Sequence, residues 1–281
     1  MKVLNVTYDD YANLSFENCQ ALKSVGVDAH SVKLIRHPFG YEQESEVVTL
    51  EIMTQLIQKA DLIQIMHSDT ASLKICQTLK KRCVVYHTGT IYRRAKQRMN
   101  QIFNPVVERC FTDQCEFIGT GMKNETYIAT AVNTTKIRKS DKRVSLPLIF
   151  AHYPSNPVVK GTDKIREMMS SHAVQFIVSD EKATHQQQMK RMSQCDVYIE
   201  LFKPEQEGQE YGCWGVTAFE ASALGKIVIT NNIRLNSYKA IYGDPCLMVA
   251  NTERQFHQTI DDLLGLSVEE IEDYQREARR S

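Results

Sequence analysis

The chain has 281 residues, and its 34 lysines and arginines balance its 34 aspartates and glutamates. This balance argues against a nucleic-acid partner, because nucleic-acid binding favours a basic excess. With 42% hydrophobic and 24% charged residues, the chain has the composition of a globular protein with one large or two medium domains.

Eight cysteines are scattered along the chain without a C-x-x-C pair, so neither a zinc ribbon nor a thioredoxin-like motif is expected. The apolar surroundings of Cys83 (RCVVYH) and Cys195 (QCDVYI) predict reduced core residues of a cytoplasmic protein. The N-terminus lacks the apolar stretch of a signal peptide, and no apolar run approaches about 18 residues. We therefore expect no membrane-spanning segment.

The first part of the chain alternates between short β-branched runs and helical patterns, with EFIGTG (116–121) and TYIATAV (126–132) as shorter strand-like pieces. This alternation indicates βαβ units with a parallel sheet, and so a Rossmann-like, doubly wound domain over residues 1–138. The expected strands are 2–8, 28–35, 61–67 and 83–87, and the expected helices are 15–26 (N-cap Ser15), 49–60, 70–81 and 93–103.

A polar, basic stretch, NTTKIRKSDKR (133–143), has no apolar periodicity and is typical of a linker. The alternation then restarts and predicts a second Rossmann-like domain over 144–281. Its expected strands are 146–153, 174–179, 196–202, 226–232 and 246–250, and its expected helices are 162–171, 183–194, 216–225 and two C-terminal helices with N-caps at Thr252 and Ser267. The predicted fold class is α/β, with two doubly wound parallel-sheet domains facing a cleft.

Parallel sheets bind ligands at the carboxyl ends of their strands, so the residues that follow each strand are the candidates for a site. In AHYPSNPVVKGTDKI (151–165), Gly161 and Thr162 open a helix whose N-terminal N–H groups favour an anion, and Lys160 adds a positive charge. This pattern predicts a phosphate cradle. The alternative is a solvated loop lysine beside an ordinary helix cap.

The stretch EYGCWGVTAFEASALGKIVITNN (210–232) precedes and includes another strand. Gly212 and Gly215 allow the backbone to approach a ligand, and a helix begins after them. Glu220, little more than one turn into that helix, can accept hydrogen bonds from ribose hydroxyls. Alternatively, Glu220 is a surface residue of a helix whose alanines pack closely.

In the first domain, His87 ends a strand in VVYHTGTIYRR (84–94), where it can donate a hydrogen bond or act as an acid or base. His67 ends the preceding strand, and Asn13 lies in the loop after the first strand. Arg93 can neutralise phosphate. For each residue a structural role is the alternative: a satisfied strand-end histidine, a helix cap or a surface charge.

Four of these segments together resemble one family, the retaining glycosyltransferases of the GT-B fold, family 4. HYPSNPVVKGTD resembles the start of its donor domain, and YGCWGVTAFEASALGKIVIT resembles its signature, in which a glycine precedes "EAMA-x-G-x-P-V-I". ADLIQIMHSD and VVYHTGTIYRR resemble the strand ends of its acceptor domain. The similarity extends over most of the chain, in the family's order and spacing.

The resemblance implies transfer of a sugar from a nucleoside-diphosphate sugar to a glycan, lipid or small-molecule acceptor, with retention, without a metal ion or other cofactor. It also leaves peripheral membrane association open. Lys160 would neutralise the leaving diphosphate, Glu220 would hold the ribose, and His87 would lie near the reacting centre. The implied donor-binding residues are Ser155, Asn156, Gly161, Thr162, Glu210, Gly212, Gly215, Val216 and Thr217, and the acceptor-side residues are Asn13, His67 and Arg93.

The chain departs from the family pattern at three positions. Gly212 stands where the family has the first glutamate of its signature, Ser155 where it has an arginine, and Ile227 where it has a proline. Glu210 is the nearest carboxylate to the missing glutamate in the sequence. These departures leave two alternatives open: a non-catalytic nucleotide-sugar-binding or partner protein, and a different reaction such as sugar-nucleotide epimerisation.

Overall fold

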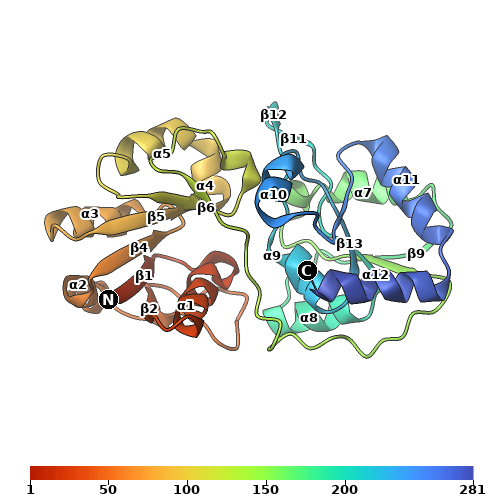
Figure 1. The fold of residues 1–281 in the computed structure, drawn as a ribbon. Helices are drawn as coiled ribbons and strands as arrows, with labels where there is room; N and C mark the ends of the chain where they lie inside the picture. The colour runs from red at the N-terminus through yellow and green to blue at the C-terminus, as the bar shows by residue number, and fades with distance from the viewer. Residues whose placement is uncertain (281) are drawn as a thin grey trace. The chain divides into compact units, whose positions relative to one another are not determined.

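The computed structural model describes residues 1–280. The chain divides between Ala131 and Val132 into two compact units, called unit 1 and unit 2 below (Figure 1). Each unit contains its own parallel sheet with helices on both faces, which confirms the predicted α/β class. The basic stretch 133–143, expected to be a linker, belongs to unit 2 in this division.

Unit 1 contains a seven-stranded parallel sheet with the strand order β3-β2-β1-β4-β5-β6-β7. The order reverses between β1 and β4, and a doubly wound sheet binds ligands at the carboxyl ends of the strands at this position. The strands are β1 (Lys2–Thr7), β2 (Asp28–Lys33), β3 (Glu46–Val47), β4 (Leu62–Met66), β5 (Cys83–His87), β6 (Cys110–Thr112) and β7 (Thr126–Tyr127).

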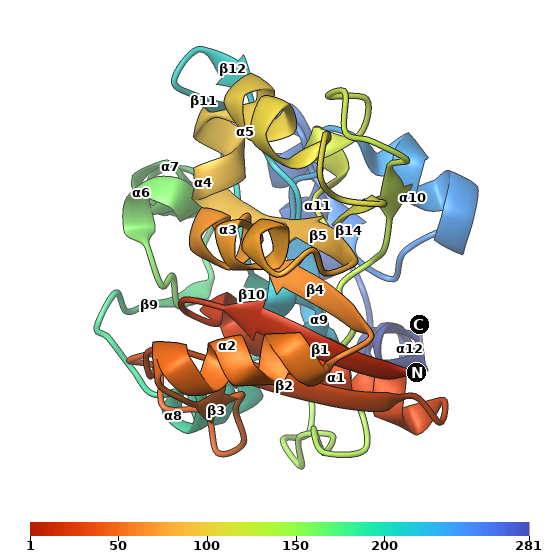
Figure 2. The same ribbon diagram turned by 90° about the vertical axis from the view of Figure 1, so that its left-hand side faces the viewer.

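The helices of unit 1 cover both faces of this sheet. Helix α1 lies on one face, and α2 and α3 lie on the other (Figures 1 and 2). Fully buried side chains such as Ile57, Ile65 and Phe103 join the sheet to its helices in one hydrophobic core. The helices are α1 (Leu14–Ser24), α2 (Leu50–Lys59), α3 (Thr70–Thr78), α4 (Gly89–Arg94), α5 (Lys96–Phe103) and the 3₁₀ turns η1 (Tyr11–Asn13) and η2 (Cys115–Phe117).

Unit 2 contains a five-stranded parallel sheet with the order β14-β13-β10-β8-β9, which reverses between β8 and β10. A short antiparallel hairpin, β11–β12, follows β10. The strands are β8 (Ile149–His152), β9 (Gln175–Val178), β10 (Val197–Ile199), β11 (Glu205–Gln206), β12 (Gln209–Glu210), β13 (Ile227–Thr230) and β14 (Met248–Val249).

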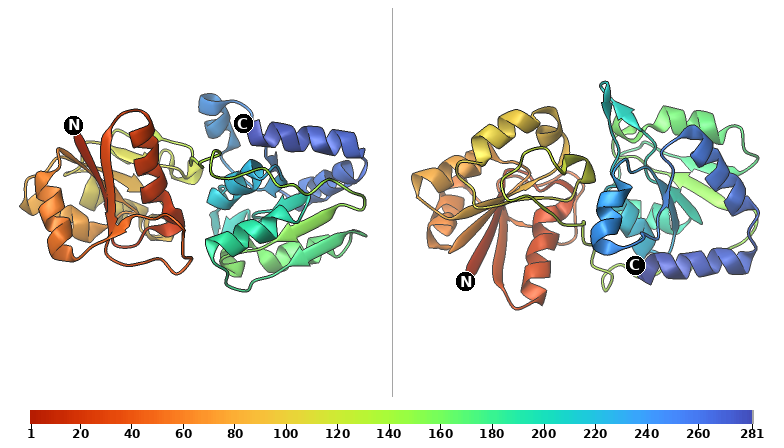
Figure 3. Two further views of the ribbon diagram at one scale, coloured as in Figure 1. Left: turned by 90° about the horizontal axis from the view of Figure 1, so that it is seen from below. Right: turned by 45° about the horizontal axis from the view of Figure 1, so that its top comes forward.

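In unit 2, α8, α9 and α12 lie on one face of the sheet, and α7 and α11 lie on the other (Figures 1 and 3). Its core is separate from that of unit 1 and includes Phe150, Ile165 and Phe256. The helices are α6 (Pro157–Lys160), α7 (Thr162–Met169), α8 (His185–Ser193), α9 (Val216–Ala223), α10 (Leu235–Tyr242), α11 (Glu253–Leu264) and α12 (Val268–Arg280).

Several local predictions are wrong. Ser15 is not an N-cap: α1 begins at Leu14, and the Asp10 carboxylate accepts the N–H groups of Ser15 and Phe16 at 2.7 and 3.1 Å. EFIGTG contains the turn η2 instead of a strand, and only two residues of TYIATAV are extended. β3, β6, α6, α10 and the hairpin were not predicted, because most of these elements are too short to display a hydrophobic period.

The two predicted caps of the C-terminal helices are confirmed. Thr252 and Ser267 each accept a backbone N–H from the third residue of the helix that follows, as capping boxes do. Within residues 1–280 every cysteine is free, and all but Cys246 are buried. No helix in that range is long and apolar enough to cross a bilayer.

Candidate functional site

The site of unit 2 lies at the carboxyl ends of β8 and β10, where the strand order reverses. After β8, Asn156 caps α6 by accepting the N–H of Val159 at 3.2 Å, and Ser155 is an exposed residue of the same loop. Gly161 joins α6 to α7 with φ +71°, and a Cβ there would lie 2.0 Å from the carbonyl oxygen of Phe202. Close backbone packing therefore requires a glycine after Lys160.

Lys160 forms an ion pair with Glu200, the residue that follows β10. Both side chains are largely buried, with 16% and 0% of their areas exposed. The same Glu200 oxygen, Oε1, accepts the N–H of Gly215 at 3.4 Å and the hydroxyl of Thr217 at 3.3 Å. Its Oε2 accepts the hydroxyl of Thr230 at 2.9 Å. Glu200 is the central carboxylate of this site, and the sequence patterns do not predict its role.

Gly215 is the N-cap of α9, and because it is a glycine, no side-chain hydrogen bond caps the helix. A Cβ at this position would lie 3.1 Å from Glu200 Oε1 and 3.2 Å from Lys160 Nζ. The glycine therefore leaves room for the ion pair at the helix N-terminus. The N–H groups of Val216 and Thr217 precede the first intrahelical hydrogen bond of α9, so this end carries partial positive charge.

Gly212 has a different explanation from the predicted close approach of a ligand. Its φ is +121°, and a Cβ would lie 1.7 Å from Nδ2 of the buried Asn231. Asn231 donates to Tyr211 O at 3.2 Å and accepts Lys203 N–H at 2.9 Å, so it holds the two ends of the hairpin segment together. Glu210, on β12, is 76% exposed and lies 3.9 Å from Arg234. The carboxylate at Lys160 is thus that of Glu200.

Glu220 lies on α9 and is buried, and its Oε1 is 2.6 Å from Nε2 of His185 at the start of α8. This contact joins the first residue of α8 to the middle of α9. With one oxygen on the histidine, the Glu220 carboxylate retains acceptor capacity on the other. Lys160, Glu200, Gly215, His185 and Glu220 are called the unit-2 site below.

Behind the unit-2 site, His152 is fully buried at the end of β8. Burial lowers the pKa of His152 to about 4, so the imidazole is neutral near pH 7. Its Nδ1 is 2.7 Å from the carbonyl oxygen of Ile199, to which only an N–H can donate. Nε2 therefore accepts the hydroxyl of Thr162 at 2.9 Å. The hydroxyl of Thr162, a predicted donor-binding residue, is therefore buried in unit 2 and bonded to His152.

The site of unit 1 lies at the carboxyl ends of β1 and β4. Asp10 is fully buried, caps α1 and accepts the hydroxyl of Ser45 at 2.8 Å. Its Oδ1 also lies 3.4 Å from Nε2 of His67, the residue after β4. The ring of Tyr11, half exposed, meets the imidazole of His67 edge-on at 5.5 Å. A carboxylate thus orients a histidine beneath an exposed aromatic ring.

The backbone of this edge is strained. Of the seven residues other than glycine with positive φ in the described chain, four lie here: Ala12, Asn13, His67 and Ser68. Left-handed conformations cost about 1–3 kcal/mol each outside glycine and cluster at functional sites. Asn13 Oδ1 is buried without a hydrogen-bond partner within residues 1–280, although its amide nitrogen donates to Gln43 O at 2.9 Å. Asp10, Asn13 and His67 are called the unit-1 site below.

His87 and Arg93 lie within unit 1. His87 is fully buried and stacks on Tyr92 with ring centroids 4.3 Å apart, and burial lowers its pKa to about 3. Its Nδ1 is 2.8 Å from the hydroxyl of Ser68, so it supports the loop that carries His67. Arg93 pairs with the buried Glu116 and lies over Phe117. The structure therefore places both residues in packing and ion-pair contacts.

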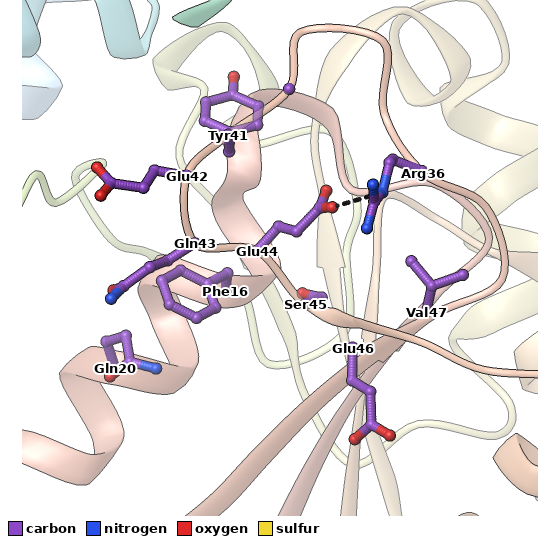
Figure 4. Close-up of a pocket in the computed structure, with 11 residues that line it drawn as sticks. Phe16, Gln20, Arg36, Tyr41, Glu42, Gln43, Glu44, Ser45, Glu46 and Val47 are labelled. Atoms are coloured by element: carbon purple, nitrogen blue, oxygen red, sulfur yellow. Dashed lines mark ion pairs between the residues drawn. The ribbon is translucent and has the colours of Figure 1, made fainter. Parts of the chain in front are cut away.

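A pocket of about 880 Å³ adjoins the unit-1 site (Figure 4). Its lining includes Phe16 on α1 and the segment 40–47, and an ion pair of 3.0 Å joins Arg36 to Glu44 at its wall. Ser45 belongs to this lining and also bonds to Asp10, so the pocket and the unit-1 site share a wall. Within residues 1–280, no three potential metal ligands of the His, Cys, Asp or Glu type come together.

The comparisons with known proteins identify the fold. No protein-family model matches the chain, and no curated protein sequence matches it. Among solved structures it resembles HepE from Anabaena, crystallised with UDP-glucose (12% identity, TM-score 0.68) and with UDP and glucose (13%, TM-score 0.66). Both matches cover 100% of this chain and 94% of HepE. A glycotransferase of kitacinnamycin matches at TM-score 0.50, with 9% identity over 99% of this chain and 95% of the other. The fold is of the GT-B type.

Proposed function

We propose that the chain is a glycosyltransferase that moves a sugar from a nucleoside-diphosphate sugar to an acceptor. The observation that carries the proposal is Lys160 beside the N-terminus of α9, at the carboxyl edge of the unit-2 sheet. A cation and free helix N–H groups there suit a diphosphate. HepE, which has the same fold, binds UDP-glucose in its crystal structure.

In this proposal unit 2 binds the donor. Glu220 holds the ribose with its remaining acceptor capacity, and His185 keeps the carboxylate in place. As the bond between the sugar and the diphosphate breaks, negative charge develops on the leaving oxygen. Lys160 and the N–H groups of Val216 and Thr217 stabilise that charge, and preorganised donors of this kind supply a large part of catalysis.

The unit-1 site binds the acceptor hydroxyl in this proposal. Asp10 orients His67, whose imidazole hydrogen-bonds to the hydroxyl, and Asn13 Oδ1 accepts a second hydrogen bond. Transfer requires the two sites to come within reach of one another during turnover. The proposal includes retention of the anomeric configuration, which the resemblance implies. It also includes independence of metal ions, because Lys160 and the N-terminus of α9 supply positive charge to the leaving group. Proton NMR of the product and activity in EDTA test these two points.

The central test is turnover and its dependence on Lys160. UDP-, GDP- and ADP-sugars are incubated with the protein, and nucleotide release is measured with and without a panel of sugar acceptors. We expect release from one donor class, with a loss of about 100-fold or more in Lys160→Ala, because removing one group that stabilises the leaving charge costs this much. The control is Lys164→Ala. Lys164 lies on α7 and pairs with Glu167, and we expect this variant to keep its activity. Absence of release from every donor contradicts the proposal.

Two observations favour a second candidate, a non-catalytic nucleotide-sugar-binding protein. Gly212 replaces the family glutamate, and Lys160 already has a carboxylate partner in Glu200. Calorimetry separates the two functions, because the second candidate binds a nucleotide sugar without releasing nucleotide.

A further inference from the structure

We propose that Glu200 sets the charge of the unit-2 site so that it admits a nucleoside-diphosphate sugar but expels the nucleoside diphosphate left after transfer. This inference rests on the proposed function and extends it to product release. Nothing in the sequence pattern of the resembling family assigns a role to this position.

The Glu200 carboxylate is held in place from several directions. Three groups reach Oε1: the Lys160 ammonium, the Gly215 N–H and the Thr217 hydroxyl. The hydroxyl of Thr230, on the neighbouring strand β13, holds Oε2. Because the side chain is fully buried among these partners, the carboxylate stays beside Lys160.

Glu200 therefore pairs with the groups of the site that would otherwise attract an anion most strongly, Lys160 and the N–H of Gly215. Without it, a lysine and a helix N-terminus would face a diphosphate with no opposing charge. With it, the charge of Lys160 is balanced, and the N–H groups of Val216 and Thr217 remain as the donors not committed to Glu200. The site then binds a diphosphate mainly through hydrogen bonds, and the carboxylate opposes the attraction of Lys160 for each added negative charge.

Donor and product differ in charge at this position. In a nucleotide sugar the β-phosphate is joined to the α-phosphate and to the sugar, and it carries one negative charge. After transfer it is a terminal phosphate whose second pKa is about 6, so the product carries about one more negative charge near neutral pH. Glu200 repels this extra charge, and the site distinguishes the product from the donor although both carry the same nucleoside.

The test compares the binding of UDP and UDP-glucose to the wild-type protein and to Glu200→Gln. The amide keeps the size of the side chain and an acceptor oxygen but removes the charge. Trp214, the chain's single tryptophan, is buried next to Gly215 and reports binding by its fluorescence. Glu210→Gln makes the same change of charge on the exposed hairpin and is the matched control.

We expect Glu200→Gln to tighten UDP binding about tenfold or more beyond any change for UDP-glucose, because like charges at close range repel strongly in a buried site. In turnover, inhibition by UDP should strengthen by a similar factor while KM for UDP-glucose moves less. A residue that only supports the fold would weaken both ligands together.

Three results overturn the inference. Equal changes for the two ligands, or weaker UDP binding in Glu200→Gln, show that Glu200 serves only to position Lys160. Failure of the wild-type protein to bind either ligand, or any nucleotide tried in their place, overturns the proposed function and this inference with it. If Glu200→Gln does not fold, Glu200→Asp withdraws the carboxylate by one methylene, and the UDP preference should shift in the same direction to a smaller extent.

Discussion

Gly212 stands at the position where the resembling family has a glutamate, and its surroundings explain the replacement. The Asn231 amide fills the space that any side chain at position 212 would need, and φ is +121°. We expect Gly212→Ala to lower the free energy of unfolding by about 2 kcal/mol or more, from strain and from displacement of Asn231. Urea unfolding measures this change.

Gly208 provides the control for Gly212→Ala. It also has positive φ, +73°, but a Cβ there meets nothing within 4 Å. Gly208→Ala should therefore cost only the backbone term, about 1 kcal/mol. Equal losses in the two variants would show that contact with Asn231 is not the reason for Gly212.

Single residues of the site differ in how far they can be predicted from sequence. Lys160 and Gly215 follow from a rule: residues after a parallel strand and at a helix N-terminus face a ligand. Glu200 falls inside the predicted strand 196–202, whereas β10 ends at Ile199, so only the fold places Glu200 at the sheet edge beside Lys160. His87 follows the same rule and is nevertheless buried, because Tyr92 and Phe103 pack around it. Strand position predicts the edge of the sheet, and packing decides which side chains are exposed there.

Among the elements, α9 is held at both ends. Glu200 meets its N-terminus, and Arg279 of α12 donates to the carbonyl of Ala223 at its C-terminus. Negative charge at the first end and positive charge at the last both complement the helix dipole. Arg279 also donates to Ile137 O at 2.9 Å and Thr134 O at 3.0 Å, so it fastens the basic segment 133–143 to the same helix.

We expect Arg279→Met to lower the free energy of unfolding by about 1–3 kcal/mol, because the partly buried carbonyl hydrogen bonds to Ala223 and Ile137 lose their charged donor. Hydrogen exchange should accelerate in segment 133–143 and at the C-terminal turn of α9. Arg276→Met, on an exposed position of α12 paired with Asp273, is the control and should change little. Unchanged exchange in segment 133–143 would show that other contacts hold it.

The long elements could be predicted because their sequences display either a continuous apolar run or a helical apolar period. Strands such as β5, with CVVYH, are continuous apolar runs, and α11 has a capping box and an amphipathic face. The hairpin β11–β12 could not be predicted, since EQEGQE has no apolar alternation and is stabilised by the closure of its base through Tyr211 N–H and Pro204 O, 3.0 Å apart. Polar segments of this kind depend on the fold around them.

At the scale of the whole molecule, each unit has the components of an independent domain. Unit 1 has a core around Ile57 and Ile65, and unit 2 has a separate core around Phe150 and Phe256. Every contact described for the unit-2 site, from Lys160 to Glu220, lies within unit 2. We therefore expect the donor-binding part of the proposed function to need no residue of unit 1.

We expect a fragment of residues 132–281 to fold alone and to bind the preferred nucleotide within about threefold of the full chain, but to transfer no sugar. Folding is expected because about 150 residues with their own core exceed the size at which single domains become marginal. Binding is measured by the thermal shift that a ligand produces when it binds only the folded state. The fragment 1–131 should fold and show no shift with nucleotide. Loss of nucleotide binding by a folded 132–281 fragment would mean that unit 1 contributes donor contacts, and that donor binding is not a property of unit 2 alone.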